Sequence, residues 1–366
     1  MMKPVRVLQV VPNMQAGGIE TLIMNLYRNV DRSKIQFDFL VHYKGDFFYD
    51  DEIRKLGGKI YHLSVRNDNN FPKYIRDLNN FFKNHSEYKA VHGHMVSTAV
   101  FYMYFAKKYG VKLRIVHSHN ADTVNGLKGI VKAKLARLAP LFANQYFACG
   151  EAAGRYLYGN KSFTVFNNGI DLDKFKFDSE IRKKYRKELG LENKFVVGHI
   201  GRFNMQKNHQ FLIRTFNEIQ KKKPNSTLLL IGAGELKHEV KNQVKNFGLE
   251  SKVKFLGTRK DTNNLYQAMD FFLLPSLFEG FPVVAVEAQD SGLPILASNS
   301  ITKEIDLTPN VKFESLKESP EKWAEYLLKW KFPKRKSHVT ELQNAGFDIK
   351  KEAQDLTAFY IKYYRE

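Results

Sequence analysis

The chain has 366 residues, which is enough for two or three domains of about 100–200 residues each. Hydrophobic residues make up 43% of the chain and aromatic residues 13%, which excludes a disordered protein and lets each half bury a core. The formal net charge of +20 favours anionic partners, namely nucleic acid, an anionic membrane surface or a phosphorylated small molecule.

Strands and helices alternate through the first half of the chain. The N-terminal apolar stretch contains a charge and has no small-residue cleavage site, so residues 5–12 are predicted as a strand and not as a signal peptide. A Gly17-Gly18 turn and a helix over 19–29 with one apolar face follow. Further strands are predicted at 37–42, 59–63, 90–95, 113–117, 146–149 and 163–166, and further helices at 73–84, 98–108 and 128–142. This alternation predicts a parallel sheet covered on both faces.

The same pattern starts again after a seam. Residues 167–175 have turn chemistry, and a highly charged helix is predicted over 178–189. Strands are then predicted at 195–200, 227–231, 253–256, 271–274 and 294–297, with helices at 208–221, 262–269 and 282–291 and another ending near residue 246. A final helix is predicted over 348–364. We therefore expect two doubly wound α/β domains in tandem, over 1–174 and 175–346.

Two glycine loops lie where a ligand would bind in such sheets. Ligands bind beyond the carboxyl ends of the strands, where backbone N–H groups and helix N-termini attract negative charge. Gly17 and Gly18 follow the first strand, and Gly232 and Gly234 follow the second strand of the second half. A glycine after a strand is most often only a turn, and Gly17-Gly18 does not fit G-x-G-x-x-G, so a dinucleotide site is poorly supported.

A more specific set of residues follows the strand over 195–200. The loop that begins at Gly201 carries Arg202 and Lys207 just beyond the strand. Lys207 opens the next helix, whose dipole disfavours a positive charge there unless an anion shares the site. A diphosphate would be such an anion, because arginine offers a planar fork of donors and lysine a point charge.

Two glutamates, Glu279 and Glu287, flank a turn that leads into a helix. Proline suits the first turn of that helix, and the open backbone N–H groups at its start can bind ligand oxygens. The residues that carry these groups are Gly280, Phe281, Pro282 and Val283. Glu287 lies further along the helix and is predicted to face a ligand that carries hydroxyl groups.

These motifs, in this order, resemble those of the family-4 retaining glycosyltransferases of the GT-B fold, particularly bacterial enzymes of capsule and exopolysaccharide assembly. The resemblance covers nearly the whole chain and rests on residues 7–20, 114–120, 168–171, 201–208, 231–235 and 279–287, the last being the E-x7-E signature. It implies two Rossmann-like domains that face each other across a cleft. It also implies that residues 347–366 pack back on the N-terminal, acceptor-binding domain, while the C-terminal domain binds the donor.

The resemblance also assigns roles to single residues. Arg202 and Lys207 match the pair that holds the donor diphosphate and neutralises it as it leaves, and Glu287 matches a ribose-binding glutamate. Glu279 matches the residue that orients the donor sugar, together with the backbone of residues 280–283. Glycines that match the donor-binding loops are Gly17, Gly18, Gly201, Gly232 and Gly234. His119 matches the histidine beside the sugar and the acceptor, with His117 as the alternative.

Two further pairs of residues invite a metal or a catalytic interpretation. His92 and His94 form a second His-x-His pair, for which a hydrogen-bonded structural pair is the simpler interpretation. Asp171 and Asp173 fit the D-x-D string of metal-dependent transferases, but we interpret them as part of the turn between the domains. Because cations and helix N-termini can stabilise the leaving phosphate, we expect no metal and no cofactor beyond the nucleotide-sugar substrate.

The expected function is hexose transfer, with retention, from a UDP-sugar to a glycan or an undecaprenyl-diphosphate-linked oligosaccharide. One alternative is another GT-B enzyme, such as a nucleotide-sugar epimerase or a phosphorylase. A second alternative is a basic nucleic-acid-binding module. Such a module predicts basic residues interleaved with aromatic residues on one face, whereas the specific residues here gather at strand ends.

The chain also carries signals about its location. Its longest apolar run, residues 99–106, is far shorter than the roughly 18–20 residues that span a bilayer, and a single cysteine suits a reducing compartment. The stretch 126–138 has no acidic residue, and its cations are Lys128, Lys132, Lys134 and Arg137. This stretch is either a surface helix packed on its sheet or a face that contacts anionic lipid. We expect a cytoplasmic protein with peripheral contact to the inner face of the plasma membrane.

Overall fold

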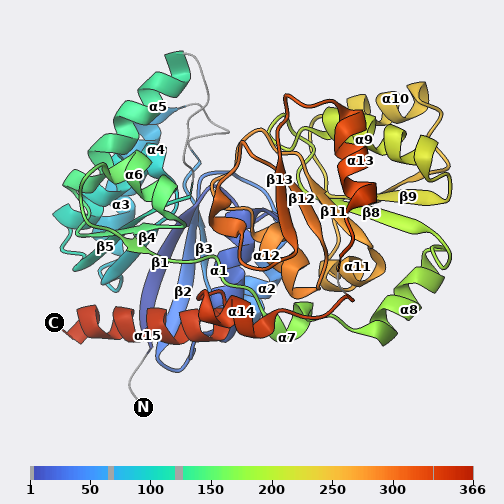
Figure 1. Cartoon of the computed structure of the whole chain (residues 1–366). Coiled ribbons are helices and arrows are strands. Elements are labelled where there is room, and N and C mark those ends of the chain that lie inside the picture. Colours follow the sequence, from blue (N-terminus) through green and yellow to red (C-terminus); the bar gives the residue numbers. More distant parts are fainter. Residues whose placement is uncertain (1–3, 65–69, 120–126, 333, 366) are drawn as a thin grey trace. The chain divides into compact units, whose positions relative to one another are not determined.

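The computed structural model describes residues 4–64, 70–119, 127–332 and 334–365 (Figure 1). Contacts divide the chain into two units, one formed by Met1–Gly169 with Ile349–Glu366 and the other by Ile170–Asp348. The first seam therefore lies at residue 169 and not at the expected residue 174. The reason is local, because Asp171 caps the short helix α7 (Leu172–Phe175), which packs on α11 (Thr262–Ala268) and α12 (Val283–Asp290) of the second unit.

The first unit is built on a seven-stranded parallel sheet with the order β3-β2-β1-β4-β5-β6-β7. Its strands are β1 (Val5–Val11), β2 (Ile35–Val41), β3 (Ile60–His62), β4 (Ala90–Gly93), β5 (Leu113–Ser118), β6 (Gln145–Ala148) and β7 (Thr164–Val165). Its helices are α1 (Gly18–Asn29), α2 (Asp50–Lys55), α3 (Phe71–Asn84), α4 (Val96–Lys108), α5 (Leu127–Leu138), α6 (Glu151–Tyr158) and α15 (Ile349–Arg365), with a 3₁₀ turn at Ala139–Leu141.

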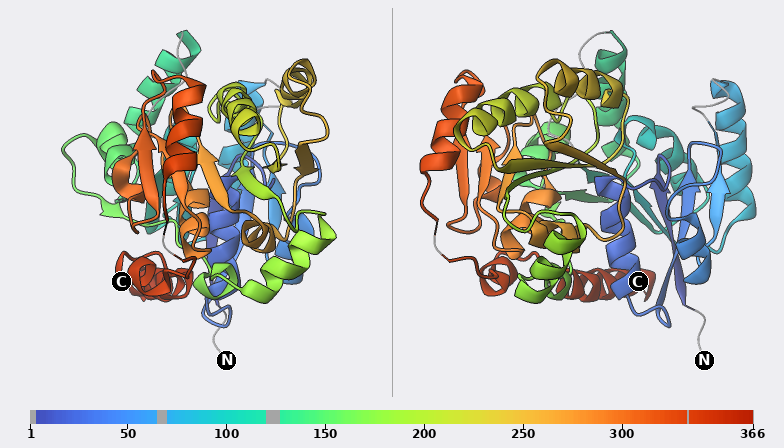
Figure 2. Two further views of the ribbon diagram at one scale, coloured as in Figure 1. Left: turned by 45° about the vertical axis from the view of Figure 1, so that its right-hand side comes forward. Right: turned by 90° about the vertical axis from the view of Figure 1, so that its right-hand side faces the viewer.

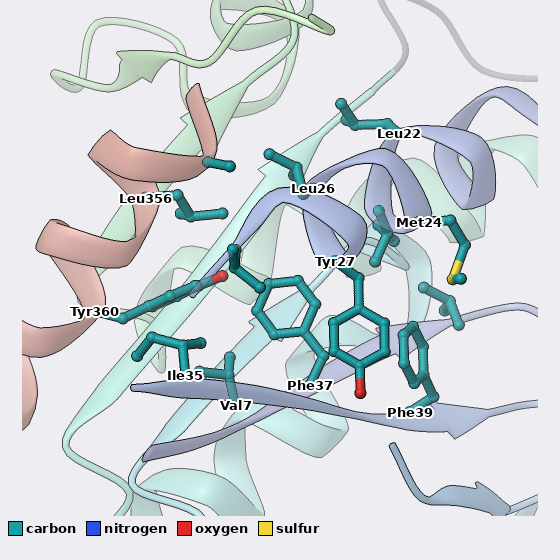
Figure 3. Close-up of a cluster of buried hydrophobic side chains, with 14 of the residues drawn as sticks. Val7, Leu22, Met24, Leu26, Tyr27, Ile35, Phe37, Phe39, Leu356 and Tyr360 are labelled. Atoms are coloured by element: carbon teal, nitrogen blue, oxygen red, sulfur yellow. The ribbon is translucent and has the colours of Figure 1, made fainter. Parts of the chain in front are cut away.

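The core of the first unit lies between β1, β2, α1 and the C-terminal helix α15 (Figure 3). Every residue of β2 is buried, as expected of a central parallel strand. Tyr27 of α1 stacks on Phe37 at 5.2 Å, and Phe37 meets Tyr360 of α15 edge to face at 6.1 Å. Each such buried side chain stabilises the fold by about 1.5–3 kcal/mol. The expected return of the C-terminal helix to the first unit is confirmed.

The second unit is built on a six-stranded parallel sheet with the order β10-β9-β8-β11-β12-β13. Its strands are β8 (Phe195–Ile200), β9 (Ser226–Ile231), β10 (Val253–Gly257), β11 (Phe271–Leu274), β12 (Ile295–Ser298) and β13 (Val311–Glu314). Besides α7, α11 and α12, its helices are α8 (Ser179–Glu188), α9 (His209–Lys222), α10 (Lys237–Asn246), α13 (Pro320–Lys329) and α14 (Val339–Asn344). A 3₁₀ turn spans Lys303–Ile305.

Helices cover both faces of each sheet, as Figure 2 shows. In the second unit α10 and α13 pack on α9, while α8 and α12 pack on α11. Several helices begin at a side-chain cap, such as Asp178 for α8 and Ser319 for α13. The two units thus have the Rossmann-like α/β architecture predicted from the sequence.

Helix α5 differs from the interpretation of residues 126–138 as a surface helix whose apolar residues pack on the sheet. Ile130 and Val131 are 56% and 54% exposed, so they do not pack on the sheet. The helix instead turns small residues inward, with Ala136 buried. Among the described helices, none combines the length and the apolar character that a membrane crossing requires.

Each sheet has one point where the strand order changes direction. In the first unit this point lies between β1 and β4, and in the second between β8 and β11. The connections that leave two such neighbouring strands run to opposite faces of the sheet, which opens a crevice at the carboxyl ends of the strands. Residues just after β1, β4, β8 and β11 are therefore the ones that this fold offers to a ligand.

Candidate active site

The loops after β8 and β11 meet at the switch point of the second unit. Lys207 Nζ lies 2.6 Å from Glu279 Oε1, and Gln206 Nε2 donates a hydrogen bond to Glu279 Oε2 at 2.9 Å. The backbone N–H of Leu277 also donates to the carbonyl oxygen of Gln206 at 2.8 Å. The side chains of Lys207 and Glu279 are only 13% and 7% exposed, so this ion pair is largely removed from water.

The glycines of the neighbouring loop allow a close approach of two backbones. A Cβ atom on Gly232, whose φ is +138°, would lie 2.1 Å from the carbonyl oxygen of Gly201. A Cβ atom on Gly234 would lie 2.4 Å from the carbonyl oxygen of Phe203. Gly201 and Gly232 are thus brought together at the carboxyl ends of β8 and β9, where a side chain would not fit.

Arg202 occupies a more open position than Lys207. Its guanidinium lies 3.0 Å from Glu235 Oε2, and its side chain is 70% exposed. Exposed pairs of this kind contribute about 0–1 kcal/mol, because solvent screens both charges. An anionic ligand can therefore take over the guanidinium at little cost.

Two histidines that the sequence analysis does not name lie beside Lys207. His199 is the penultimate residue of β8, and its Nδ1 donates a hydrogen bond to the carbonyl oxygen of Leu273, 2.8 Å away. His209 opens α9 and stacks on Phe203 with ring centroids 4.2 Å apart. Burial lowers the pKa of His209 to about 4, so its ring is neutral near pH 7. Only their positions in the sequence could have pointed to them. His199 precedes the 201–207 loop by two residues, and His209 follows it by two residues.

Glu287 lies inside α12, which begins at Val283 with Pro282 in the capping position. The Tyr266 hydroxyl donates to Glu287 Oε2 at 2.8 Å, and the carboxyl group is buried. Burial raises the pKa of Glu287 to about 7. The carboxyl group at this place can accept hydrogen bonds from ligand hydroxyls, which would replace the water that burial removes. Phe281, on the turn before the helix, stacks on Phe347 at 5.2 Å.

The first glycine pair lies after β1, at the switch point of the first unit. Gly17 caps α1, and a Cβ atom there would lie 2.3 Å from Glu20 Oε2, so the Glu20 carboxylate lies over Gly17. A Cβ atom on Gly18 would meet no described atom within 4 Å. A side chain at position 17 would displace the flexible end of Glu20, whereas open space surrounds Gly18 in the described part of the chain.

The four histidines of the two His-x-His pairs form one buried cluster. They lie at the carboxyl ends of β4 and β5 on the same face of the sheet, since side chains alternate along a strand. His92 Nε2 lies 3.1 Å from His117 Nδ1, and His94 Nδ1 lies 2.8 Å from His119 Nε2. His92 and His94 are hydrogen-bonded, as the simpler interpretation expected, and their bonds join them to the pair that includes the candidate catalytic histidine.

The cluster also contains the one metal-like arrangement found among the described residues. Ligand atoms of His92, His94 and His117 all lie within 4.8 Å of one another. The rings of His92 and His117 are nearly parallel, at an interplanar angle of 14°. The same nitrogens are within hydrogen-bonding distance of one another, since His92 Nε2 faces His117 Nδ1 at 3.1 Å. The cluster therefore suits a hydrogen-bond network better than a metal ion.

The acidic D-x-D string has a local structural role. Asp171 accepts a hydrogen bond from the backbone N–H of Lys174 at 3.3 Å and so caps α7. Asp173 lies in the first turn of that helix, where its charge suits the helix dipole. This accounts for both residues without a metal ion.

Comparison with known proteins identifies the family. The model of Glycosyltransferase Family 4 matches residues 16–174, and that of Glycosyl transferases group 1 matches residues 181–331. EpsF of Bacillus subtilis (strain 168), named as a glycosyltransferase, is 34% identical over 97% of this chain and 96% of its own length. The chain belongs to the family-4 glycosyltransferases.

Other relatives of this glycosyltransferase agree. The capsular polysaccharide biosynthesis glycosyltransferase CapH of Staphylococcus aureus is 26% identical over 98% of this chain and 99% of its own. Among solved structures, HepE of Anabaena in complex with UDP and glucose has a TM-score of 0.81 and 20% identity, covering 98% of this chain and 100% of that one. The glycosyltransferase WaaG, involved in lipopolysaccharide biosynthesis, has a TM-score of 0.69 at 16% identity, covering 96% of this chain and 95% of that one. These likenesses confirm the predicted GT-B fold.

The glycosyltransferase brings together part of the set that the sequence singled out. Lys207 and Glu279 are in direct contact, and Gly201 and Gly232 touch. Glu287 is paired with Tyr266, a partner for which the sequence held no signal. The candidates of the first unit are Gly17 and Gly18, which follow β1 at the switch point of that unit, and His119, which follows the strand β5.

Proposed function

We propose that this glycosyltransferase transfers a hexose from a UDP-sugar, with retention and without a metal ion, to a glycan or an undecaprenyl-diphosphate-linked acceptor in capsular or exopolysaccharide assembly. The observation that carries the donor assignment is the largely buried Lys207–Glu279 ion pair at the switch point of the second unit. A cation held there by a carboxylate is positioned before any ligand arrives, so little reorganisation accompanies the loss of the diphosphate.

The names of relatives support this substrate class. HepE of Anabaena has been crystallised with UDP-glucose. An Escherichia coli protein named UDP-Gal:alpha-D-GlcNAc-diphosphoundecaprenol alpha-1,3-galactosyltransferase is 39% identical over 142 residues, which are 37% of this chain and 36% of its own. UDP-sugars and lipid-diphosphate acceptors are therefore the first substrates to test.

In the proposed reaction the bond between the anomeric carbon and the diphosphate oxygen breaks, and a bond from that carbon to the acceptor oxygen forms. Lys207 and Arg202 neutralise the negative charge that collects on the departing diphosphate. The proton of the acceptor hydroxyl passes to the diphosphate, which leaves on the same face. Glu279 accepts hydrogen bonds from sugar hydroxyls once the diphosphate shares Lys207, and Glu287 accepts them from the ribose. His119 accepts one from the donor sugar or the acceptor.

The proposed location follows from α5. Helix α5 exposes apolar side chains, such as Ile130 and Val131. The exposed cations Lys132, Lys134 and Arg137 follow them on the same helix. The side chain of Lys128, the other expected cation, lies outside the described residues. A face that combines apolar groups and cations can rest on an anionic bilayer, with about 1 kcal/mol for each cation near the surface. A peripheral position on the inner face of the plasma membrane would bring a lipid-linked acceptor within reach.

The test of the donor site separates charge from folding. In Lys207→Met the Glu279 carboxylate loses its cationic partner, which can destabilise the fold. We therefore compare this variant with the double variant Lys207→Met/Glu279→Gln, which removes both charges. We expect both variants to lose about 30- to 1,000-fold in UDP release from UDP-hexoses, corresponding to about 2–4 kcal/mol of barrier, while the double variant regains stability. Lys221→Met, an exposed lysine of α9, is the control.

Near-normal turnover in the double variant would contradict the donor site. Formation of an epimer of the sugar, or dependence of turnover on inorganic phosphate, would instead identify one of the other GT-B activities. Anomer analysis of the product by NMR tests retention separately.

A further inference from the structure

One buried chain of hydrogen bonds connects all four histidines of the cluster to a single glutamine of β1. Gln9 lies opposite His92 in the β1–β4 register, on the same face of the sheet. One branch runs from the Gln9 side chain through His94 to His119, and the other runs through Tyr360 and His92 to His117. We name them the His94 branch and the Tyr360 branch.

Every side chain in this hydrogen-bond network is uncharged near pH 7. Burial lowers the pKa of His92 and of His119 to about 3, and it moves the pKa values of His94 and His117 well below the ordinary value. Burial also raises the pKa of the Tyr360 hydroxyl, so this group keeps its proton. A neutral imidazole has one N–H donor and one acceptor nitrogen, so each ring passes a hydrogen bond on in one direction only.

The His94 branch begins at the carbonyl oxygen of the Gln9 amide, which can only accept. His94 Nε2, 2.9 Å away, therefore carries its hydrogen and donates it. His94 Nδ1 is then the acceptor, so His119 Nε2, at 2.8 Å, carries a hydrogen as well. His119 Nδ1 is left with a lone pair. This atom is buried and has no hydrogen-bond partner among the described residues.

The Tyr360 branch begins at the amide nitrogen of Gln9, which donates to the Tyr360 hydroxyl at 3.4 Å. The hydroxyl hydrogen is then directed to His92 Nδ1, at 2.6 Å. His92 Nε2 in turn donates to His117 Nδ1 at 3.1 Å. His117 Nε2 therefore carries a hydrogen, and it too is buried without a partner in the described part of the chain.

We infer that Gln9 is a positioning residue that sets the tautomer of all four histidines, and that it makes His119 Nδ1 a hydrogen-bond acceptor. Rotating the amide by half a turn would exchange its donor and acceptor and reverse every bond in both branches. A single amide orientation thus decides whether His119 offers a lone pair or an N–H group. The consequence for catalysis rests on the proposed function, in which His119 accepts a hydrogen bond from a sugar or acceptor hydroxyl.

The test is a ¹⁵N NMR measurement of histidine tautomers on the full chain with labelled histidine. In the native protein we expect all four rings to carry hydrogen on Nε2, with His119 assigned by comparison with His119→Gln. In Gln9→Met, which is close in shape but has no amide, we expect His94 and His119 to become mixtures of tautomers. Tyr360→Phe is the matched control, since it opens only the Tyr360 branch and leaves His119 as it was.

Turnover of the UDP-sugar is then measured in the same variants. We expect turnover in Gln9→Met to fall in proportion to the fraction of His119 that keeps its hydrogen on Nε2. Because His119 is unchanged in Tyr360→Phe, we expect that variant to keep the turnover of the native protein. Native His119 with its hydrogen on Nδ1, or an unchanged single tautomer in Gln9→Met, would overturn the inference. If the tautomers are as expected but no UDP-sugar is turned over, the role of Gln9 stands and the proposed function falls.

Discussion

Replacing Glu287 with glutamine removes a buried group that is poorly placed to ionise. Its carboxyl group accepts a hydrogen bond from Tyr266, and burial raises its pKa to about 7 from the ordinary 4.5. The folded protein therefore holds this proton more tightly than the unfolded chain does. The stabilisation is complete below pH 4.5 and is lost as the pH rises to about 7.

The size of the effect follows from that shift. One pKa unit corresponds to about 1.4 kcal/mol, so the shift from 4.5 to about 7 removes about 3 kcal/mol from the second unit at alkaline pH. Glutamine cannot ionise and keeps the shape of the side chain. Glu287→Gln should therefore change stability little at pH 5 and stabilise the second unit by roughly 2–3 kcal/mol at pH 8.5.

Hydrogen exchange of the amides of β8 and β9 measures this free energy in the second unit itself. After correction for the intrinsic rate, we expect these amides to exchange roughly 50- to 100-fold more slowly in Glu287→Gln than in the native protein at pH 8.5. Burial raises the pKa of Asp290 to about 7 as well, so the native protein and the variant share that second contribution. The contribution of Asp290 therefore cancels when the exchange rates of Glu287→Gln and the native protein are compared.

Glu250→Gln, which changes an exposed carboxyl group of the same unit, is the control. A difference between Glu287→Gln and the native protein that stays constant from pH 5 to pH 8.5 would refute the reasoning. A difference of opposite sign would mean that the attraction between Lys174 and the ionised Glu287 outweighs the effect of burial.

Two further outcomes are expected from the proposed function. Lys132→Glu/Lys134→Glu/Arg137→Glu should abolish sedimentation with vesicles that contain phosphatidylglycerol, because three favourable charges of about 1 kcal/mol each are reversed, while UDP release in solution persists. Equal sedimentation with neutral vesicles would contradict the membrane face. Excess EDTA should leave transfer activity unchanged. Complete loss of activity with EDTA would indicate that Asp171 and Asp173 bind a metal ion.

Most strands could be predicted because a strand buried on both faces is an apolar run. The residues of β11, for example, are all apolar and all buried. The edge strand β13 was not predicted, since only Val311 is buried and charged residues alternate along it. Helix α6 was also missed, because Gly154 in its middle suggests a break. The structure shows why glycine stands there, as a Cβ atom would lie 2.2 Å from the Phe163 ring.

The site could be predicted only where its residues follow strands directly. Lys207 and Glu279 were found because switch-point loops carry polar residues at fixed places in the chain. The partner of Glu287 was not found, because no pattern links residue 287 to Tyr266. The pairing of Gln9 with Tyr360 spans 351 positions, and an ordinary amphipathic helix gives no hint that one of its tyrosines enters a histidine network.

The return of α15 to the first unit sets an order of events on the ribosome. The whole second unit is translated between Gly169 and Ile349, so the first unit lacks its last helix while that stretch is made. At about 5–20 residues per second this interval lasts roughly 10–40 s. Until then the apolar groups that face Leu356 stay uncovered, and Gln9 has no Tyr360 to bond. Translation must therefore reach α15 before the histidine network of the first unit can close.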